Sequence, residues 1–161
     1  MNKSLNRVQE AFLRLVRNQA WTSAHNALKQ MHPADLAILL PYLQTSEQKW
    51  FAKTLLECGK LSGVLSELDE NAILQLSEML TEDQLVRAMQ EMDPDDAADL
   101  IIVLPEEQRT KVFDQLSGTI KHTIGKLLGH APDTAGGIMT TVLLSFPETL
   151  PVQAAVAELC R

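Results

Sequence analysis

Apolar residues recur along most of the chain with the spacing of short amphipathic helices. The first example is SLNRVQEAFLRLVRNQ, residues 4–19, where apolar positions separated by three and four residues share one face of a helix. Ser4 stands where a hydroxyl can cap the start of this helix. A second short helix is expected through WTSAHNALKQM, which ends at the His32–Pro33 step.

The middle of the chain is repetitive. MHPADLAILLPYL, which begins at Met31, matches MDPDDAADLIIVL, which begins at Met92, at a shift of 61 residues. LDENAILQLSEMLTEDQ, which begins at Leu68, matches MDPDDAADLIIVLPEEQ at a shift of 24. Each unit contains a turn, an acidic helix start, an apolar helix, and a break at TSEQ, TEDQ or PEEQ that starts another helix. Such hairpins bury each other's apolar faces in a solenoid. We therefore predict an all-α superhelical stack of short helices through about Leu128, with no strand before Gly129.

The pattern changes after residue 129. TTVLLSF, residues 140–146, favours a β-strand, and PVQAAVAEL predicts a helix with Pro151 in its first turn. A single strand and helix cannot bury their own apolar face. The pattern therefore predicts a helical domain over residues 1–129, followed by a linker and a truncated βα piece of a second domain over residues 130–161. We expect the residues after about Gly136 to be disordered, or ordered only by packing against another copy.

Charge is unevenly distributed along a chain whose net charge is -7. Between Glu67 and Glu107 the sequence has thirteen acidic residues and one basic residue, Arg87, a local charge of -12. The first thirty residues carry a charge of +4. Nucleic acid is excluded as a partner because its phosphate backbone requires basic stripes. The acidic segment requires either solvation or a compensating cation.

The most acidic helix start is EMDPDDAADLIIVLPEEQ, which begins at Glu91. On a helix Asp95 and Asp99 are four residues apart and therefore neighbours on one face, where two carboxylates repel. A hard divalent cation would reverse the sign of that interaction, since Mg²⁺ binds one or two carboxylates and keeps several waters. Alternatively, Asp93 to Asp96 only cap and solvate the helix start. The spacing by itself favours this second interpretation.

Other kinds of chemistry lack a suitable pattern. The histidines and the two cysteines, Cys58 and Cys160, do not have transition-metal ligand spacing. Ser, His and Asp are scattered, so we expect no hydrolase and no other enzyme. No secretory signal is recognisable, and the longest apolar runs are far shorter than the roughly 20 residues that cross a bilayer.

Several of these motifs together resemble the MgtE magnesium transporters and channels of bacteria. They are MHPADLAILLPYL, MDPDDAADLIIVLPEEQ and, most specifically, APDTAGGIMTT followed by LSFPETLPVQAAVAEL. The resemblance implies a cytoplasmic superhelical N-domain, then a pair of CBS domains and a five-helix transmembrane pore domain, assembled as a homodimer. The chain would then lie on the cytoplasmic side of the bacterial inner membrane, and the full protein would reach the membrane only through its pore domain.

The resemblance also implies a function. In this family Mg²⁺ ions between the acidic faces of the N-domain, the CBS domains and the plug helix of the pore keep the channel closed when cytosolic magnesium is high. On that basis we assign Asp95 and Asp99 as regulatory Mg²⁺ ligands and leave the capping role to Asp93 and Asp96. Because the partner ligands would lie in the CBS domains, binding to this chain by itself is expected to be weak.

An alternative function is a standalone acidic helical adaptor that binds a basic protein partner. The segment DTAGGIMTTVLLSFPETLP distinguishes the two, because an adaptor has no need of it. A CBS pair and five apolar spans encoded beyond Arg161 would favour the channel domain, and a stop codon there would favour the adaptor.

Overall fold

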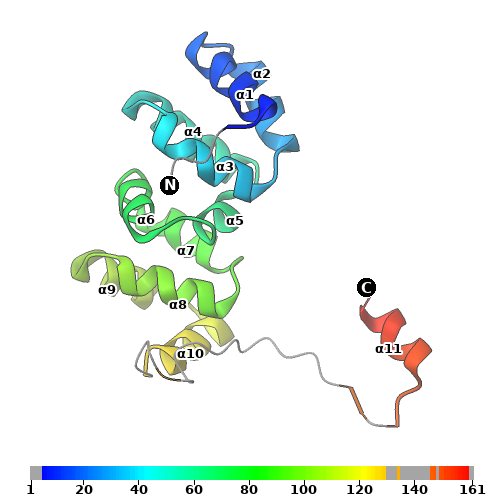
Figure 1. Cartoon of the computed structure of the whole chain (residues 1–161). Helices are drawn as coiled ribbons and strands as arrows, with labels where there is room; N and C mark the ends of the chain where they lie inside the picture. The colour runs from blue at the N-terminus through cyan, green and yellow to red at the C-terminus, as the bar shows by residue number, and fades with distance from the viewer. Residues whose placement is uncertain (1–4, 130–133, 135–145, 148, 160–161) are drawn as a thin grey trace.

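The chain forms a stack of short helices in a computed structural model (Figure 1), which describes residues 5–129, 134, 146–147 and 149–159. The helices, in chain order, are α1 (Arg7–Arg17), α2 (Trp21–Gln30), α3 (Pro33–Leu39), the 3₁₀ turn η1 (Leu40–Tyr42), α4 (Thr45–Glu57), α5 (Leu61–Leu65), α6 (Glu70–Ser77), α7 (Glu82–Met89), α8 (Pro94–Val103), α9 (Glu106–Gln115), α10 (Gly118–Leu127) and α11 (Val152–Leu159). The described residues contain no strand, which confirms the predicted all-α class.

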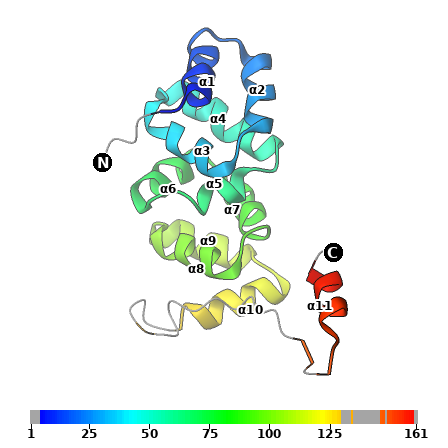
Figure 2. The same cartoon turned by 45° about the vertical axis from the view of Figure 1, so that its right-hand side comes forward.

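Helices two apart in the chain lie against each other. From α1 to α9, each odd-numbered helix contacts the next odd-numbered helix. Helix α8 contacts both α6 and α10. The stack therefore runs from α1 and α2 at one end to α10 at the other (Figures 1 and 2). This is the order expected when hairpins of one repeated unit bury each other's apolar faces.

The helix starts follow the sequence signals closely. Pro33 and Pro94 are the first residues of α3 and α8, where a missing N–H costs no helical hydrogen bond. Thr81 caps α7, and Thr81 and Gln84 accept hydrogen bonds from each other's backbone N–H. The Nδ1 atom of His32 accepts a hydrogen bond from the N–H of Ala34 and thereby serves the turn before α3.

The cap of α1 differs from the prediction. Helix α1 begins at Arg7, and its N-cap is Asn6 rather than Ser4, which lies outside the described residues. Asn6 Oδ1 accepts a hydrogen bond from the N–H of Gln9 at 2.9 Å, and Gln9 Oε1 accepts one from the N–H of Asn6 at 2.9 Å. This reciprocal pair satisfies two backbone donors at once, which one hydroxyl placed further upstream does not.

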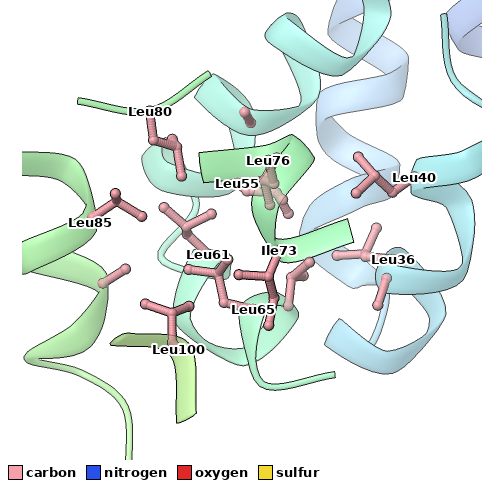
Figure 3. Packing of buried hydrophobic residues seen from close by; sticks show 14 of the residues in the cluster. Leu36, Leu40, Leu55, Leu61, Leu65, Ile73, Leu76, Leu80, Leu85 and Leu100 are labelled. Atoms are coloured by element: carbon pink, nitrogen blue, oxygen red, sulfur yellow. The ribbon is translucent and has the colours of Figure 1, made fainter. Parts of the chain in front are cut away.

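One hydrophobic core runs the length of the stack. Figure 3 shows leucines from successive helices directed toward one another, with Leu61 and Leu65 of α5 beside Ile73 of α6. Leu36, Leu76 and Leu100 are fully buried and come from α3, α6 and α8 respectively. Buried amides also connect the units: Gln48 Nε2 donates hydrogen bonds to the carbonyls of Leu40 and Leu43. Each helix is therefore held mainly by its neighbours in the stack.

The segment after residue 129 is only partly described. Helix α11 is present where PVQAAVAEL predicted a helix, and it stands apart from the stack in both views (Figures 1 and 2). Val152 and Val156 lie largely exposed on it. The predicted strand at residues 140–146 lies outside the described residues except for Phe146. The domain boundary at residue 129 and the CBS piece stay predictions. No helix in the described residues is long and apolar enough to span a membrane.

Candidate magnesium-binding region

Acidic residues gather where α8 begins. Asp93 occupies the N-cap position with an extended backbone, but its side chain makes no capping hydrogen bond. Asp93 therefore stands at the predicted cap position, but the prediction that its side chain caps the helix by a hydrogen bond is wrong. Asp95 and Asp96 lie in the first turn, where the partial positive charge of the helix N-terminus favours carboxylates. Asp99 follows one turn later.

A groove of about 530 Å³ separates the loop before α6 and the start of α6 from α8. Four carboxylates line it: Asp69, Glu70, Asp96 and Asp99. Ser66 and six apolar residues line the rest: Leu65, Leu68, Ile73, Leu100, Ile102 and Val103. We refer to this feature, with an acidic rim and an apolar lining, as the acidic groove. No lysine or arginine lines it.

The pKa of Asp99 on α8 is raised by its surroundings. Partial burial raises the pKa of Asp99 above its usual range, and the negative charges of Asp96 and then Asp95 raise it further. The Oδ1 atom of Asp95 is buried and has no hydrogen-bond partner among the described residues. A buried carboxylate oxygen without a donor is costly, so a cation or a donor that reached this oxygen would stabilise it.

The structure groups these residues differently from the sequence analysis. Asp99 lines the acidic groove together with Asp96, which had been assigned a capping role, whereas Asp95 does not line it. Asp69 and Glu70 complete the rim and were not singled out from the sequence. A signal for Asp69 was present, since the shift of 24 residues aligns it with Asp93. Asp69 does cap its helix, because its Oδ1 accepts a hydrogen bond from the N–H of Ala72.

The arrangement suits part of a magnesium site. No group of three or more His, Cys, Asp or Glu side chains in the described residues is close enough to hold a metal ion by itself. Mg²⁺ requires less than that, since it is usually held by one or two carboxylates and keeps several waters. Asp95, with its unpaired oxygen, and Asp99, in a negative environment, have the required chemistry for a half-site. Their role as ligands stays a prediction.

Comparison with known proteins agrees with the fold. Residues 31–133 match the family described as the MgtE intracellular N domain. One similar solved structure is the soluble part of a magnesium transporter, with a TM-score of 0.73 and 21% identity over 86% of this chain. Another is the cytosolic domain of the Mg²⁺ channel MgtE in complex with ATP, with a TM-score of 0.72 and 22% identity over 82% of this chain. No curated protein sequence matches the chain.

The helical stack and the matched segment define an all-α intracellular N-domain, a class without enzymatic activity. More specifically, the chain belongs to the MgtE intracellular N domain family. It spans 54% of the length of each of the two solved chains.

Proposed function

We propose that this chain is the regulatory, magnesium-sensing N-domain of an MgtE-type magnesium channel and helps to close the pore when cytosolic Mg²⁺ is high. In this proposal the full protein is a homodimer. The chain lies on the cytoplasmic side of the bacterial inner membrane, and its partners are the CBS domains and the plug helix of the pore domain. The observation that carries the proposal is the self-repelling acidic surface at the start of α8, in a domain of this family.

The carboxylates of α8 supply the free energy that a sensor requires. Without a cation, Asp95, Asp96 and Asp99 repel one another, and Asp95 Oδ1 lacks a donor. Bound Mg²⁺ would neutralise part of this charge, and an acidic face of a neighbouring domain would supply the remaining ligands. A site that is complete in only one arrangement of domains favours that arrangement, because binding shifts an equilibrium only through different affinities for the two states.

Binding to this chain by itself tests the first step. Millimolar Mg²⁺ should shift the backbone amide resonances of Asp95 and Asp99 in a saturable way, and Asp95→Asn with Asp99→Asn should abolish that response. Asp83→Asn with Asp114→Asn is a matched control, because it removes the same charge from exposed sites outside the acidic groove. Its Mg²⁺ response should equal that of the wild type. Shifts that NaCl of equal ionic strength reproduces would contradict the proposal.

A further inference from the structure

The rim of the acidic groove has no basic partner. Among the described residues, Asp69, Glu70, Asp96 and Asp99 take part in no ion pair. The apolar lining is also incompletely covered, since Ile102 is 44% exposed. A concave surface with apolar lining and acidic rim fits the apolar stripe and the flanking cations of a basic amphipathic helix.

A helix with that chemistry, α1, lies in the basic N-terminal part of the chain. The inner face of α1 is used by the core through Phe12, Leu13 and Val16. Beside this face, Val8, which is 61% exposed, and Ala11 form a short outer apolar stripe, whereas Leu15 is partly buried against the core. Val8 and Ala11 therefore leave part of α1 apolar and exposed.

Basic residues border that outer stripe. Arg7 and Arg14 are exposed and lie beside Val8 and Ala11 at helical spacing. Arg7 makes no ion pair in the described residues, and Arg14 makes only a 3.9 Å contact with Glu10 on its own helix. The chain thus carries a basic amphipathic helix face and an acidic apolar groove, each without a partner.

We propose that the occupant of the acidic groove is α1 of a second copy of this chain. Val8 and Ala11 would contact the apolar lining around Ile102, while Arg7 and Arg14 would pair with the acidic rim. Charge complementarity supports this occupant, because residues 1–30 carry +4 and the segment from Glu67 to Glu107 carries -12. Asp99 is shared with the proposed magnesium site, so Mg²⁺ bound there would compete with this contact.

The contact joins two different surfaces, so it is heterologous. One helix of 11 residues covers less than the roughly 1,000 Å² expected of a stable interface. The association is therefore weak, and it grows with protein concentration. Salt opposes it, since raising NaCl from about 0.01 M to about 1 M shortens the Debye length from about 30 Å to about 3 Å.

Sedimentation equilibrium over a range of protein concentrations tests the contact. The buffer contains a chelator, so that failure of this proposal is distinguishable from failure of magnesium sensing. The mean mass should rise with concentration at low salt and fall to the monomer at high salt. Arg7→Glu with Arg14→Glu should lower the association constant by about tenfold or more. Lys49→Glu with Lys126→Glu makes the same charge change on exposed residues of α4 and α10 and should have a much smaller effect.

A mixing experiment identifies the two surfaces. The groove variant Asp96→Lys with Asp99→Lys should also fail to self-associate. When it is mixed with Arg7→Glu, Arg14→Glu, each α1 meets a groove of opposite charge and association should return. Circular dichroism checks that both variants keep wild-type helix content. A wild type that remains monomeric at low salt, or variants that do not associate when mixed, would overturn the proposal.

The apolar part of the contact has its own test. Val8→Ser on α1 should weaken self-association, whereas Val152→Ser on α11, at a residue that is 75% exposed, should not. Both changes remove a similar exposed apolar side chain from a helix. Equal effects of the two variants would show nonspecific hydrophobic association and would contradict docking through α1.

Discussion

At the scale of single residues, the ionised carboxylate of Asp99 opposes folding at neutral pH. The pKa of Asp99 is raised by burial and by its two acidic neighbours. A raised folded-state pKa means that stability is highest below the pKa of the unfolded chain and falls as the pH rises through the raised value. Asp99→Asn should therefore raise the free energy of unfolding at pH 7. This gain should vanish at a pH below the usual aspartate range, as measured by urea unfolding across pH.

Neutralising both proposed ligands should have a small net effect on stability. Asp95→Asn with Asp99→Asn relieves repulsion but also removes the favourable interaction of Asp95 with the helix N-terminus. In low salt the free energy of unfolding should be unchanged or raised by a few tenths of a kcal/mol. A loss of more than about 1 kcal/mol in urea unfolding would show that these carboxylates are structural.

Two helix ends provide a matched test of backbone conformation. Helices α1 and α4 both end with paired backbone hydrogen bonds around a residue of positive φ, which is Gln19 (φ 55°) after α1 and Gly59 (φ 63°) after α4. A Cβ at Gly59 would meet no atom within 4 Å, so only the backbone conformation opposes it. Gly59→Ala should destabilise by about 1 kcal/mol. Gln19→Gly should stabilise by a few tenths of a kcal/mol, because the entropy of glycine offsets part of the relief. Thermal unfolding measures the change in stability of both variants. If both variants were stabilised, or both destabilised, the prediction would be contradicted.

At the scale of elements, stability comes from contacts between neighbouring helices. Leu100 is fully buried in α8, which contacts α6, α9 and α10, whereas Ile102 on the same helix is partly exposed. Leu100→Ala should lower the free energy of unfolding by about 2–5 kcal/mol. Ile102→Ala should lower it by about 0.5 kcal/mol or less. Comparable losses in urea unfolding would contradict the assignment of the core.

The elements were more predictable from sequence than the site. Proline and acidic residues fix helix starts through local backbone chemistry, so Pro33, Pro94 and the TEDQ segment predicted α3, α8 and α7. The acidic groove arises instead from packing of α6 against α8, and no local pattern specifies which side of a helix faces a neighbour two elements away. For that reason Asp96 was assigned to a cap although it lines the groove. Asn and Ser are both common capping residues, so the sequence allowed either Asn6 or Ser4 as the cap of α1. Only the hydrogen bonds between Asn6 and Gln9 decide in favour of Asn6.

At the scale of the whole molecule, the stack holds a basic end and an acidic middle in one rigid series of helices. The fold and the family were predictable because the repeated units and the motifs extend over most of the chain. The relation of this domain to the proposed CBS and pore domains was not, because it depends on residues outside those that the structure describes. The acidic surface of α8 lies within the described residues, and its proposed role in Mg²⁺ sensing can be tested there.

Gating of the full-length channel tests that claim most directly. Channel current would be recorded in membrane patches while the Mg²⁺ concentration on the cytosolic side is varied. Asp95→Asn with Asp99→Asn should shift Mg²⁺-dependent closure to higher Mg²⁺ and leave conduction of the open pore unchanged, because it removes ligands that act only in the closed assembly. Asp83→Asn with Asp114→Asn should gate like the wild type. If the Asp95 and Asp99 double variant closed at the same Mg²⁺ concentration as the wild type, these aspartates would be no more than a solvated helix start.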